Sequence, residues 1–203
     1  MSSNAIVYVI DDDSALRDSL SFLLASSGLS VRLFDSAEAF LAEPPPLAEG
    51  CILTDIRMEG LDGVELLRRL RETGHAIPVI VMTGHGDVPL AVKAMKLGAT
   101  DFVEKPFDAD ALIKVVRSAL LPESPSMATD VLHEELMARL ASLSEREAQV
   151  LKGLVEGQTN KEIAREYDLS PRTVEVYRAK LMTKMQAGSI SELVRFAIKA
   201  GAC

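Results

Sequence analysis

Five short apolar segments alternate with five segments of helical spacing over the first 120 residues, and this alternation constrains the fold more than any other feature of the sequence. The apolar segments are 5–10, 30–34, 51–55, 77–82 and 100–105, and the helical ones are 14–28, 36–43, 62–74, 87–98 and 108–121. Continuously apolar strands are typical of a parallel sheet covered by helices on both faces. We predict an α/β fold, a doubly wound five-stranded parallel sheet, with Ser14 opening the first helix and Asp62 capping the third.

The last third of the sequence shows helical patterns and no strand pattern. The helical segments are 144–157, 160–168, 170–185 and 189–201, and 131–143 has the same character. The segment 121–130, LPESPSMATD, combines proline, serine and acid in the way that linkers do. We therefore predict a first domain at 1–121, a linker at 122–141 that can be helical, and an all-α four-helix domain at 142–203.

Composition excludes several classes of protein. With 48% hydrophobic and 26% charged residues, the chain is typical of a globular protein and not of a disordered one. It contains no apolar run of roughly 20 residues and no basic N-terminal segment, so we expect neither a membrane span nor a signal peptide. Two cysteines make no disulfide framework and no structural zinc site, which favours a cytoplasmic location.

The net charge of −8 lies entirely in residues 1–125, whereas residues 126–203 are balanced. Within the balanced part, 170–186 contains four cationic residues and one glutamate. This cluster is the part of the chain that could attract a polyanion.

Acidic residues gather at the carboxyl ends of the predicted strands, where parallel sheets bind their ligands. Asp11 and Asp12 end the first strand, Asp55 ends the third, and Thr83 and Lys105 end the next two. Carboxylates that converge at one edge repel each other and need a cation, and oxygen ligands suit Mg²⁺. We expect Asp11 and Asp12 to bind the metal and Asp55 to act as a nucleophile toward phosphorus. Lys105 and the Thr83 hydroxyl would bind the phosphoryl oxygens.

The motifs IDDD, TDIRM, MTG and EKPF, in this order, resemble the receiver domain of bacterial response regulators over residues 4–121. The resemblance implies the flavodoxin-like strand order 2-1-3-4-5, a phosphoryl group accepted from a sensor histidine kinase, and a cis Lys105–Pro106 bond. Its implied site residues are Asp55 as phosphoacceptor, Asp11, Asp12, Asp55 and the Arg57 backbone carbonyl at Mg²⁺, and Thr83 and Phe102 as the switch. Glu59 stands where the family commonly has proline, so the loop after Asp55 is expected to differ.

Two other classes of protein remain as alternatives. A haloacid-dehalogenase-like, Mg-dependent phosphatase also places paired aspartates after its first strand, but its late acidic motif would require an acid where Ala91 stands. A flavodoxin-like flavin carrier shares the fold, but it needs a phosphate-binding loop where DDDSAL would repel phosphate.

The segment 170–185 predicts a helix with one buried face and one exposed face. Val174, Tyr177, Leu181 and Met185 form an apolar stripe at helical spacing, and Ser170 followed by proline suits a helix start. With the short helical segment before it, the pattern predicts a helix-turn-helix whose second helix enters the major groove. The predicted DNA-facing residues are Arg172, Thr173, Glu175, Val176, Arg178, Ala179, Lys180, Thr183 and Lys184. A small helical bundle with a solvated basic face is the alternative.

Residues 142–201, beginning LSEREAQVLKGLVEG, resemble the output domain of the LuxR/NarL class of transcription regulators, with Tyr177 where histidine is frequent. The resemblance implies a dimer on promoter DNA and contact with RNA polymerase. The receiver stretch GHGDVPLAVKAMKLGATDFVEKPF further resembles the FixJ subgroup. That resemblance implies an activator of nitrogen-fixation genes paired with an oxygen-sensing haem kinase.

Together the resemblances imply a phosphorylation-activated transcription regulator, not an enzyme acting on a separate substrate, although it would catalyse phosphoryl transfer to its own Asp55. We expect a monomer that becomes a homodimer through the 88–121 face when phosphorylated. Candidate positions on this face are Ala91, Val92, Met95, Lys96, Phe107 and Ile113, of which Val92 and Met95 are expected to pack in the core instead. A regulator of the same class with another set of target genes is the alternative.

Overall fold

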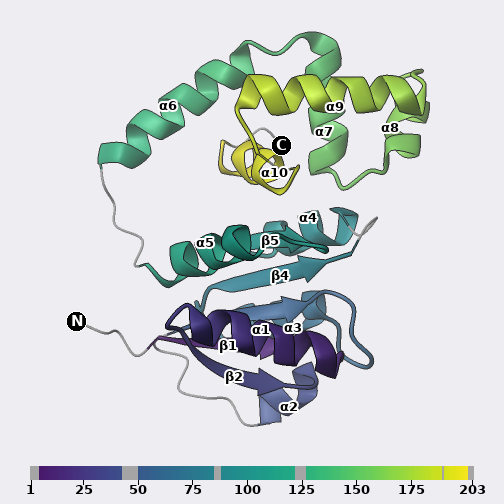
Figure 1. Cartoon of the computed structure of the whole chain (residues 1–203). Helices are drawn as coiled ribbons and strands as arrows, with labels where there is room; N and C mark the ends of the chain where they lie inside the picture. The colour runs from purple at the N-terminus through teal and green to yellow at the C-terminus, as the bar shows by residue number, and fades with distance from the viewer. Residues whose placement is uncertain (1–4, 43–49, 85–87, 122–126, 189, 201–203) are drawn as a thin grey trace. The chain divides into compact units, whose positions relative to one another are not determined.

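The computed structural model describes residues 5–42, 50–84, 88–121, 127–188 and 190–200, and Figure 1 shows its helices and strands. The chain divides into two compact units between Pro122 and Glu123. The domain boundaries predicted at 121 and 142 remain predictions, and residues 122–126 of the predicted linker lie outside the described residues.

The first unit is a five-stranded, all-parallel sheet in the order β2-β1-β3-β4-β5, which confirms the predicted fold class and strand order. The strands are β1 (Ile6–Ile10), β2 (Ser30–Phe34), β3 (Gly50–Asp55), β4 (Val79–Thr83) and β5 (Asp101–Glu104). The helices are α1 (Ser14–Ser26), α2 (Ala37–Ala42), α3 (Gly63–Glu72), α4 (Val88–Lys96) and α5 (Ala109–Leu120). In the parallel register, Ile10 lies opposite Thr54, and Asp55 opposite Met82, so the carboxyl ends of β1, β3 and β4 meet at one edge.

Alternate strand residues point to opposite faces of the sheet, and both faces are buried along the central strands β1, β3 and β4, whereas the edge strand β2 is largely exposed. Val9 and Leu53 belong to one core cluster with Leu20 of α1 and Leu112 of α5. On β1, Tyr8 points to the other face, where its ring meets that of Phe40 from α2 at a centroid distance of 5.9 Å. Burial on both faces explains why these strands are continuously apolar.

The helix starts confirm one sequence prediction and correct another. Asp62 caps α3, accepting the backbone N–H of Glu65 at 2.7 Å. Ser14, however, is already the first helical residue of α1. Its cap is Asp13, whose Oδ1 accepts the backbone N–H of Ala15 at 2.9 Å. Aspartate and serine are about equally good at this position, so the sequence alone did not separate the two neighbours.

The second unit contains helices and no strands over its described residues. Its helices are α6 (Met127–Ala141), α7 (Glu145–Val155), α8 (Asn160–Glu166), α9 (Pro171–Met185) and α10 (Ile190–Lys199). The long α9 crosses α7 and α8 (Figure 1), and Ser170 caps it as predicted. The predicted apolar stripe of α9 is also confirmed: Val174, Leu181 and Met185 are buried in the core, with Tyr177 packed against it.

Helix α6 belongs to the second unit. Leu136 is buried in its core, and the Arg139 guanidinium donates a 3.3 Å hydrogen bond to the Met185 carbonyl at the end of α9. The described part of the predicted linker, 127–141, is therefore helical, and Leu136 and Arg139 pack it on the second unit. Among the described helices, none combines the length and the apolar character that a membrane span requires.

Candidate functional site

The three acidic residues predicted to share a site do come together. One carboxylate oxygen from each of Asp11, Asp12 and Asp55 lies within 4.8 Å of the other two. Asp11 is 1% exposed and Asp55 is 9% exposed, whereas Asp12 lies at the surface. Three carboxylates this close repel each other unless a cation lies among them. An all-oxygen donor set that is open to water on the Asp12 side has the chemistry that Mg²⁺ prefers.

Lys105 supplies one cation to this cluster. Its Nζ lies 3.0 Å from Asp11 Oδ2 and 3.0 Å from Asp55 Oδ1. Burial raises the pKa of Asp55, and the hydrogen bond from Lys105 offsets only part of that increase. For Lys105, burial favours the neutral amine, but hydrogen bonds to Asp55 and Asp11 outweigh it and raise the pKa of the ammonium. The lysine is therefore charged and bridges the two buried carboxylates.

Backbone groups fix the orientation of the buried carboxylates. Asp11 Oδ1 accepts the N–H of Asp13 at 2.9 Å, and Asp55 Oδ1 accepts the N–H of Ile56 at 3.0 Å. The start of α3 packs directly on the strand end, because a Cβ placed on Gly63 would lie 2.3 Å from the Asp55 carbonyl oxygen. Arg17, which sequence analysis missed, donates a 2.7 Å hydrogen bond to the Asp11 carbonyl. Spacing alone gave no signal for that contact.

The predicted switch residues lie on the neighbouring strands. Thr83 is buried, and its hydroxyl donates only a long hydrogen bond, 3.3 Å, to the Gly84 carbonyl. Phe102 is 2% exposed, so this predicted switch residue is buried in the structure, and its role remains a prediction. The Lys105–Pro106 bond is cis, as expected. Arg57 is exposed in the loop after Asp55, and the role of its carbonyl as a metal ligand remains a prediction.

On the predicted dimer face, the structure separates core residues from surface residues. Ala91, Val92 and Met95 are buried, so they pack within the first unit and are not surface positions. Lys96 is exposed, and Phe107 and Ile113 are half-buried.

The second candidate site is the helix-turn-helix formed by α8 and α9. Asp168, in the turn between them, has φ of 53°, a left-handed conformation that aspartate tolerates better than most residues. On the exposed face of α9, Val176 is 50% exposed. A hollow of about 650 Å³ opens there, lined by Glu147, Val176, Ala179, Lys180, Thr183 and Lys184. Of the other predicted DNA-facing residues, Arg172 and Glu175 are exposed, and Thr173 and Arg178 are half-buried.

The cationic side chains of α9 differ in how they are held. Lys184 Nζ lies 2.6 Å from Glu147 Oε2, and an Arg178 guanidinium nitrogen donates a 2.6 Å hydrogen bond to Asn160 Oδ1 at the start of α8. Lys180 Nζ lies 5.5 Å from the centroid of the Tyr177 ring. Lys184 and Arg178 are thus paired within the unit, although Lys184 is itself exposed, while Lys180 and Arg172 lie at the surface without such a pairing to a carboxylate or amide in the described residues.

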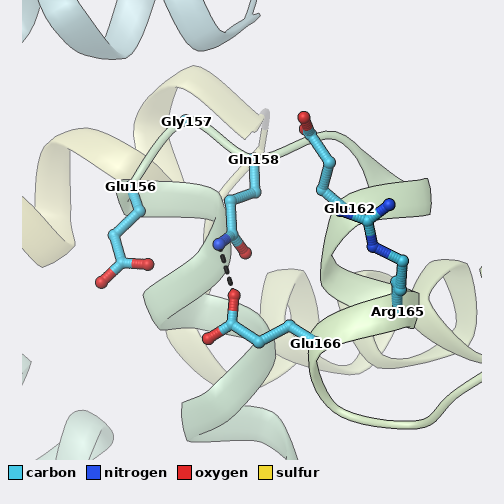
Figure 2. A pocket seen from close by; sticks show the side chains of 6 residues that line it. All are labelled: Glu156, Gly157, Gln158, Glu162, Arg165 and Glu166. Carbon is cyan, nitrogen blue, oxygen red and sulfur yellow. Dashed lines mark hydrogen bonds between the residues drawn. The ribbon is translucent and has the colours of Figure 1, made fainter.

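A second hollow, of about 560 Å³, lies where the chain turns from α7 into α8 (Figure 2). The charged side chains that line it are Glu156, Glu162, Glu166 and Arg165. The Gln158 side-chain amide donates a hydrogen bond to a Glu166 carboxylate oxygen at 2.5 Å. Three carboxylates against one guanidinium repel a phosphate backbone, so the exposed face of α9 is the better surface for a polyanion.

Glu147 is the residue of the second unit that sequence analysis missed. Its Oε2 accepts both the Lys184 ammonium and the Ser144 backbone N–H, and the Ser144 hydroxyl accepts the Glu147 N–H. This is a capping box that starts α7, and the spacing Ser-x-x-Glu signals it in the sequence. No comparable signal pairs Glu147 with Lys184.

Both units match known protein families. Residues 7–117 match the response regulator receiver domain, and residues 141–197 match the bacterial regulatory proteins of the luxR family. The chain is 57% identical to the transcriptional regulatory protein FixJ of Bradyrhizobium diazoefficiens over 99% of this chain and 98% of the relative. It is 48% identical to FixJ of Rhizobium meliloti over 96% of each chain.

Solved structures of FixJ also resemble this chain. The crystal structure of full-length FixJ from B. japonicum covers 100% of both chains, with 56% identity and a TM-score of 0.57. The crystal structure of FixJ-N covers 59% of this chain and 94% of that chain, with 48% identity and a TM-score of 0.56.

The Glu147–Lys184 pair predicts how the stability of the second unit depends on pH. The hydrogen bond from Lys184, helped by Ser144, lowers the pKa of Glu147 to about 2. A carboxyl group whose pKa is lower in the folded state stabilises the fold above its unfolded pKa, about 4.3, and this contribution is lost as the pH falls toward 2. Glu147→Gln should therefore lower the free energy of unfolding at pH 7 and flatten its decline between pH 5 and 2.

Urea unfolding followed by the NMR signals of Tyr177 measures this dependence, and the exposed Glu145 in the same helical turn supplies the control variant Glu145→Gln. The prediction is wrong if Glu147→Gln keeps the wild-type slope over that pH range.

Proposed function

The chain belongs to the two-component response regulators that join a receiver domain to a LuxR-type DNA-binding domain, and from this premise we propose that Asp55 is its phosphoacceptor and α9 its DNA-reading helix. It is a phosphorylation-activated transcription regulator of the FixJ type. The observation that carries the residue assignment is the Lys105 ammonium 3.0 Å from Asp55, beside two further carboxylates. Because the chain belongs to this family, the alternatives of a haloacid-dehalogenase-like phosphatase and a flavin carrier are not pursued.

Asp11, Asp12, Asp55 and the Arg57 carbonyl would hold Mg²⁺, and the clustered carboxylate oxygens fit that ion. When bound, Mg²⁺ would offset the charge of the carboxylates and of an incoming phosphoryl group. Asp55 is the nucleophile because it is the acid that ends β3, and its Oδ1 is already oriented by the Ile56 amide. Asp11 and Asp12, which follow β1, flank it as ligands.

In the proposed transfer, an Asp55 carboxylate oxygen attacks the phosphorus of a phosphohistidine on a sensor histidine kinase. The bond from phosphorus to the imidazole nitrogen breaks as the new oxygen–phosphorus bond forms, and the imidazole takes up a proton as it leaves. Lys105 binds a phosphoryl oxygen, a short move for an ammonium already 3.0 Å from Asp55. The buried Thr83 hydroxyl exchanges its long hydrogen bond to Gly84 for a phosphoryl oxygen.

Phosphorylation would then act on the 88–121 face. The product carries about −1.5 to −2 charges at neutral pH in place of one, which draws Thr83 toward it. Thr83 ends β4, and α4 and α5 both pack on this strand, so its movement reaches that face. The face carries exposed Lys93 and Lys96 on α4 and exposed Asp110 on α5. In a two-fold symmetric dimer, the lysines of one protomer can therefore face the aspartate of the other.

The exposed face of α9 supports the proposed reading of promoter DNA. Val176, Ala179 and Thr183 present apolar groups, which suit contact with thymine methyl groups in the major groove. Lys180 and Arg172 at the surface are placed for phosphates or base edges. A dimer would set two such helices on paired half-sites, from which an activator contacts RNA polymerase in the cytoplasm.

The target genes are proposed from the relatives. Those named FixJ are 57%, 56% and 48% identical to this chain, whereas those named TodT and DctR are 46% and 44% identical. This order favours a FixJ-like set of nitrogen-fixation genes and an oxygen-sensing haem kinase as the phosphoryl donor. Chromatin immunoprecipitation with sequencing tests the proposal, since promoters of another set of genes would support the alternative.

Asp55→Asn should abolish phosphorylation, because an amide oxygen is a far weaker nucleophile than a carboxylate. Incubation with acetyl phosphate and Mg²⁺, followed by intact-protein mass spectrometry, should show one added phosphoryl group on the wild type and none on the variant. The exposed Asp18 of α1 supplies the control Asp18→Asn, which should react as the wild type does. Equal yields from wild type and Asp55→Asn would refute the assignment.

Lys96→Glu should weaken phosphorylation-dependent dimerisation about tenfold, or about 1.4 kcal/mol, by reversing a charge on the proposed face. Sedimentation velocity with and without beryllofluoride measures the dimer fraction. Lys161→Glu, at an exposed position of α8, should leave it unchanged. An activated wild type that stays monomeric would exclude dimerisation as the switch.

Lys180→Ala should weaken binding to DNA and reduce the salt slope of the affinity by about 1, because a phosphate contact releases one counterion. Lys184→Ala should change this slope less, since its ammonium is already paired with Glu147. Fluorescence anisotropy on a duplex selected from a random library measures both, with the exposed Lys152→Ala on α7 as the control. Equal slope changes for Lys180→Ala and Lys184→Ala would show that the internal pairing does not persist on DNA.

A further inference from the structure

We propose that the backbone amide of Glu59, braced by Glu38, positions Asp12 as a metal ligand, and that the chain has this donor because residue 59 is not proline. The inference rests on the proposed magnesium site and identifies the groups that shape it. The proposal is based on a hydrogen bond of 3.1 Å from the Glu59 N–H to Asp12 Oδ2, two residues that are 47 positions apart in the sequence.

Asp12 needs such a partner more than the other two acids do. Asp11 and Asp55 are buried, and each accepts one backbone N–H and contacts the Lys105 ammonium. Asp12 is exposed, so its side chain would otherwise exchange among rotamers in water. The Glu59 amide holds Oδ2 and restricts that freedom, while the carboxylate keeps free lone pairs for a cation.

The loop that presents this amide is tied at a second point. Glu38, in the first turn of α2, accepts the Leu61 N–H on its Oε1 at 2.8 Å. Between the two donors, Gly60 has φ of 76°, and a Cβ there would lie 2.6 Å from the same Glu38 oxygen. The chain therefore turns sharply at Gly60, with the amide before it directed to Asp12 and the amide after it directed to Glu38.

A proline at position 59 would have no N–H to donate, so the bond to Asp12 depends on the residue type there. The Glu59 side chain is not needed, because the donor is the main chain. Groups that hydrogen-bond a metal ligand fix its orientation, and their removal typically weakens metal binding 10- to 100-fold. Since Asp12 is exposed and the amide is neutral, we place the expected effect at about tenfold, the lower end of that range.

The test compares Glu59→Ala, which keeps the amide, with Glu59→Pro, which removes it, in the full chain. Isothermal titration with Mg²⁺ should give Glu59→Ala a Kd within about twofold of the wild type and Glu59→Pro a Kd about tenfold weaker. Circular dichroism establishes that the proline variant is folded. A folded Glu59→Pro variant that binds Mg²⁺ as tightly as the wild type, or more tightly, would overturn the proposal.

A second pair of variants tests the brace without proline. Glu38→Ala removes the acceptor for Leu61, and Glu38→Gln keeps an oxygen at that place. We expect about threefold weaker Mg²⁺ binding for the first and little change for the second. If both variants lose the same Mg²⁺ affinity, the effect comes from the charge of Glu38 and not from its hydrogen bond to Leu61, and the proposed role of that bond is refuted. A wild type that binds no Mg²⁺ would refute the proposed metal site itself, an outcome separate from a failure confined to the Glu59 and Glu38 variants.

Discussion

Repulsion among three carboxylates at one edge of the sheet is the constraint on which the first unit depends. The parallel register brings the ends of β1 and β3 together, so the carboxylates of Asp11 and Asp55 lie close to each other. Asp12, the next residue after Asp11, adds a third carboxylate. Lys105, which directly follows the edge strand β5, neutralises part of this charge. A site that stays short of positive charge favours a divalent cation, and it favours a phosphoryl group only once that cation is present. The fold thus leaves an excess of negative charge at the edge of the sheet where phosphoryl transfer is proposed.

In the second unit, cations that are paired with other residues of the unit must be distinguished from cations available to a ligand. Lys184 pairs with the nearly buried Glu147, which also caps α7, and this contact fixes the end of α9 against the start of α7. Arg178 ties α9 to Asn160 of α8 in the same way. Lys180, by contrast, lies at the surface near the Tyr177 ring. Helix spacing places all three on α9 but does not tell which of them the domain uses for its own assembly.

The sequence predicted a parallel sheet and the gathering of acids, because strands buried on both faces are continuously apolar and their ends share one edge. The strand order followed from the resemblance to receiver domains. It placed the start of α1 one residue late, since Asp13 and Ser14 are similar capping residues. It did not predict the Glu59 amide on Asp12 or Glu147 on Lys184. The first depends on a backbone donor that is the same in every residue except proline. The second depends on how two helices cross, which brings together residues 37 positions apart.

A main-chain connection between the ends of β4 and β5 offers a route by which the proposed phosphorylation of Asp55 would change a surface. The Lys105 N–H donates to the Thr83 carbonyl at 2.7 Å, so the ends of β4 and β5 are joined through the main chain. In the proposed mechanism, Thr83 and Lys105 both turn to the same phosphoryl oxygens, and the joined strand ends respond together. Because α4 packs on both strands and α5 on β4, the proposed response would reach the 88–121 face as a repacking of helices. The loop held by Glu59 and Glu38 contacts Asp12 after β1 and the first turn of α2, so the metal affinity proposed to depend on it would be set apart from the β4 and β5 ends.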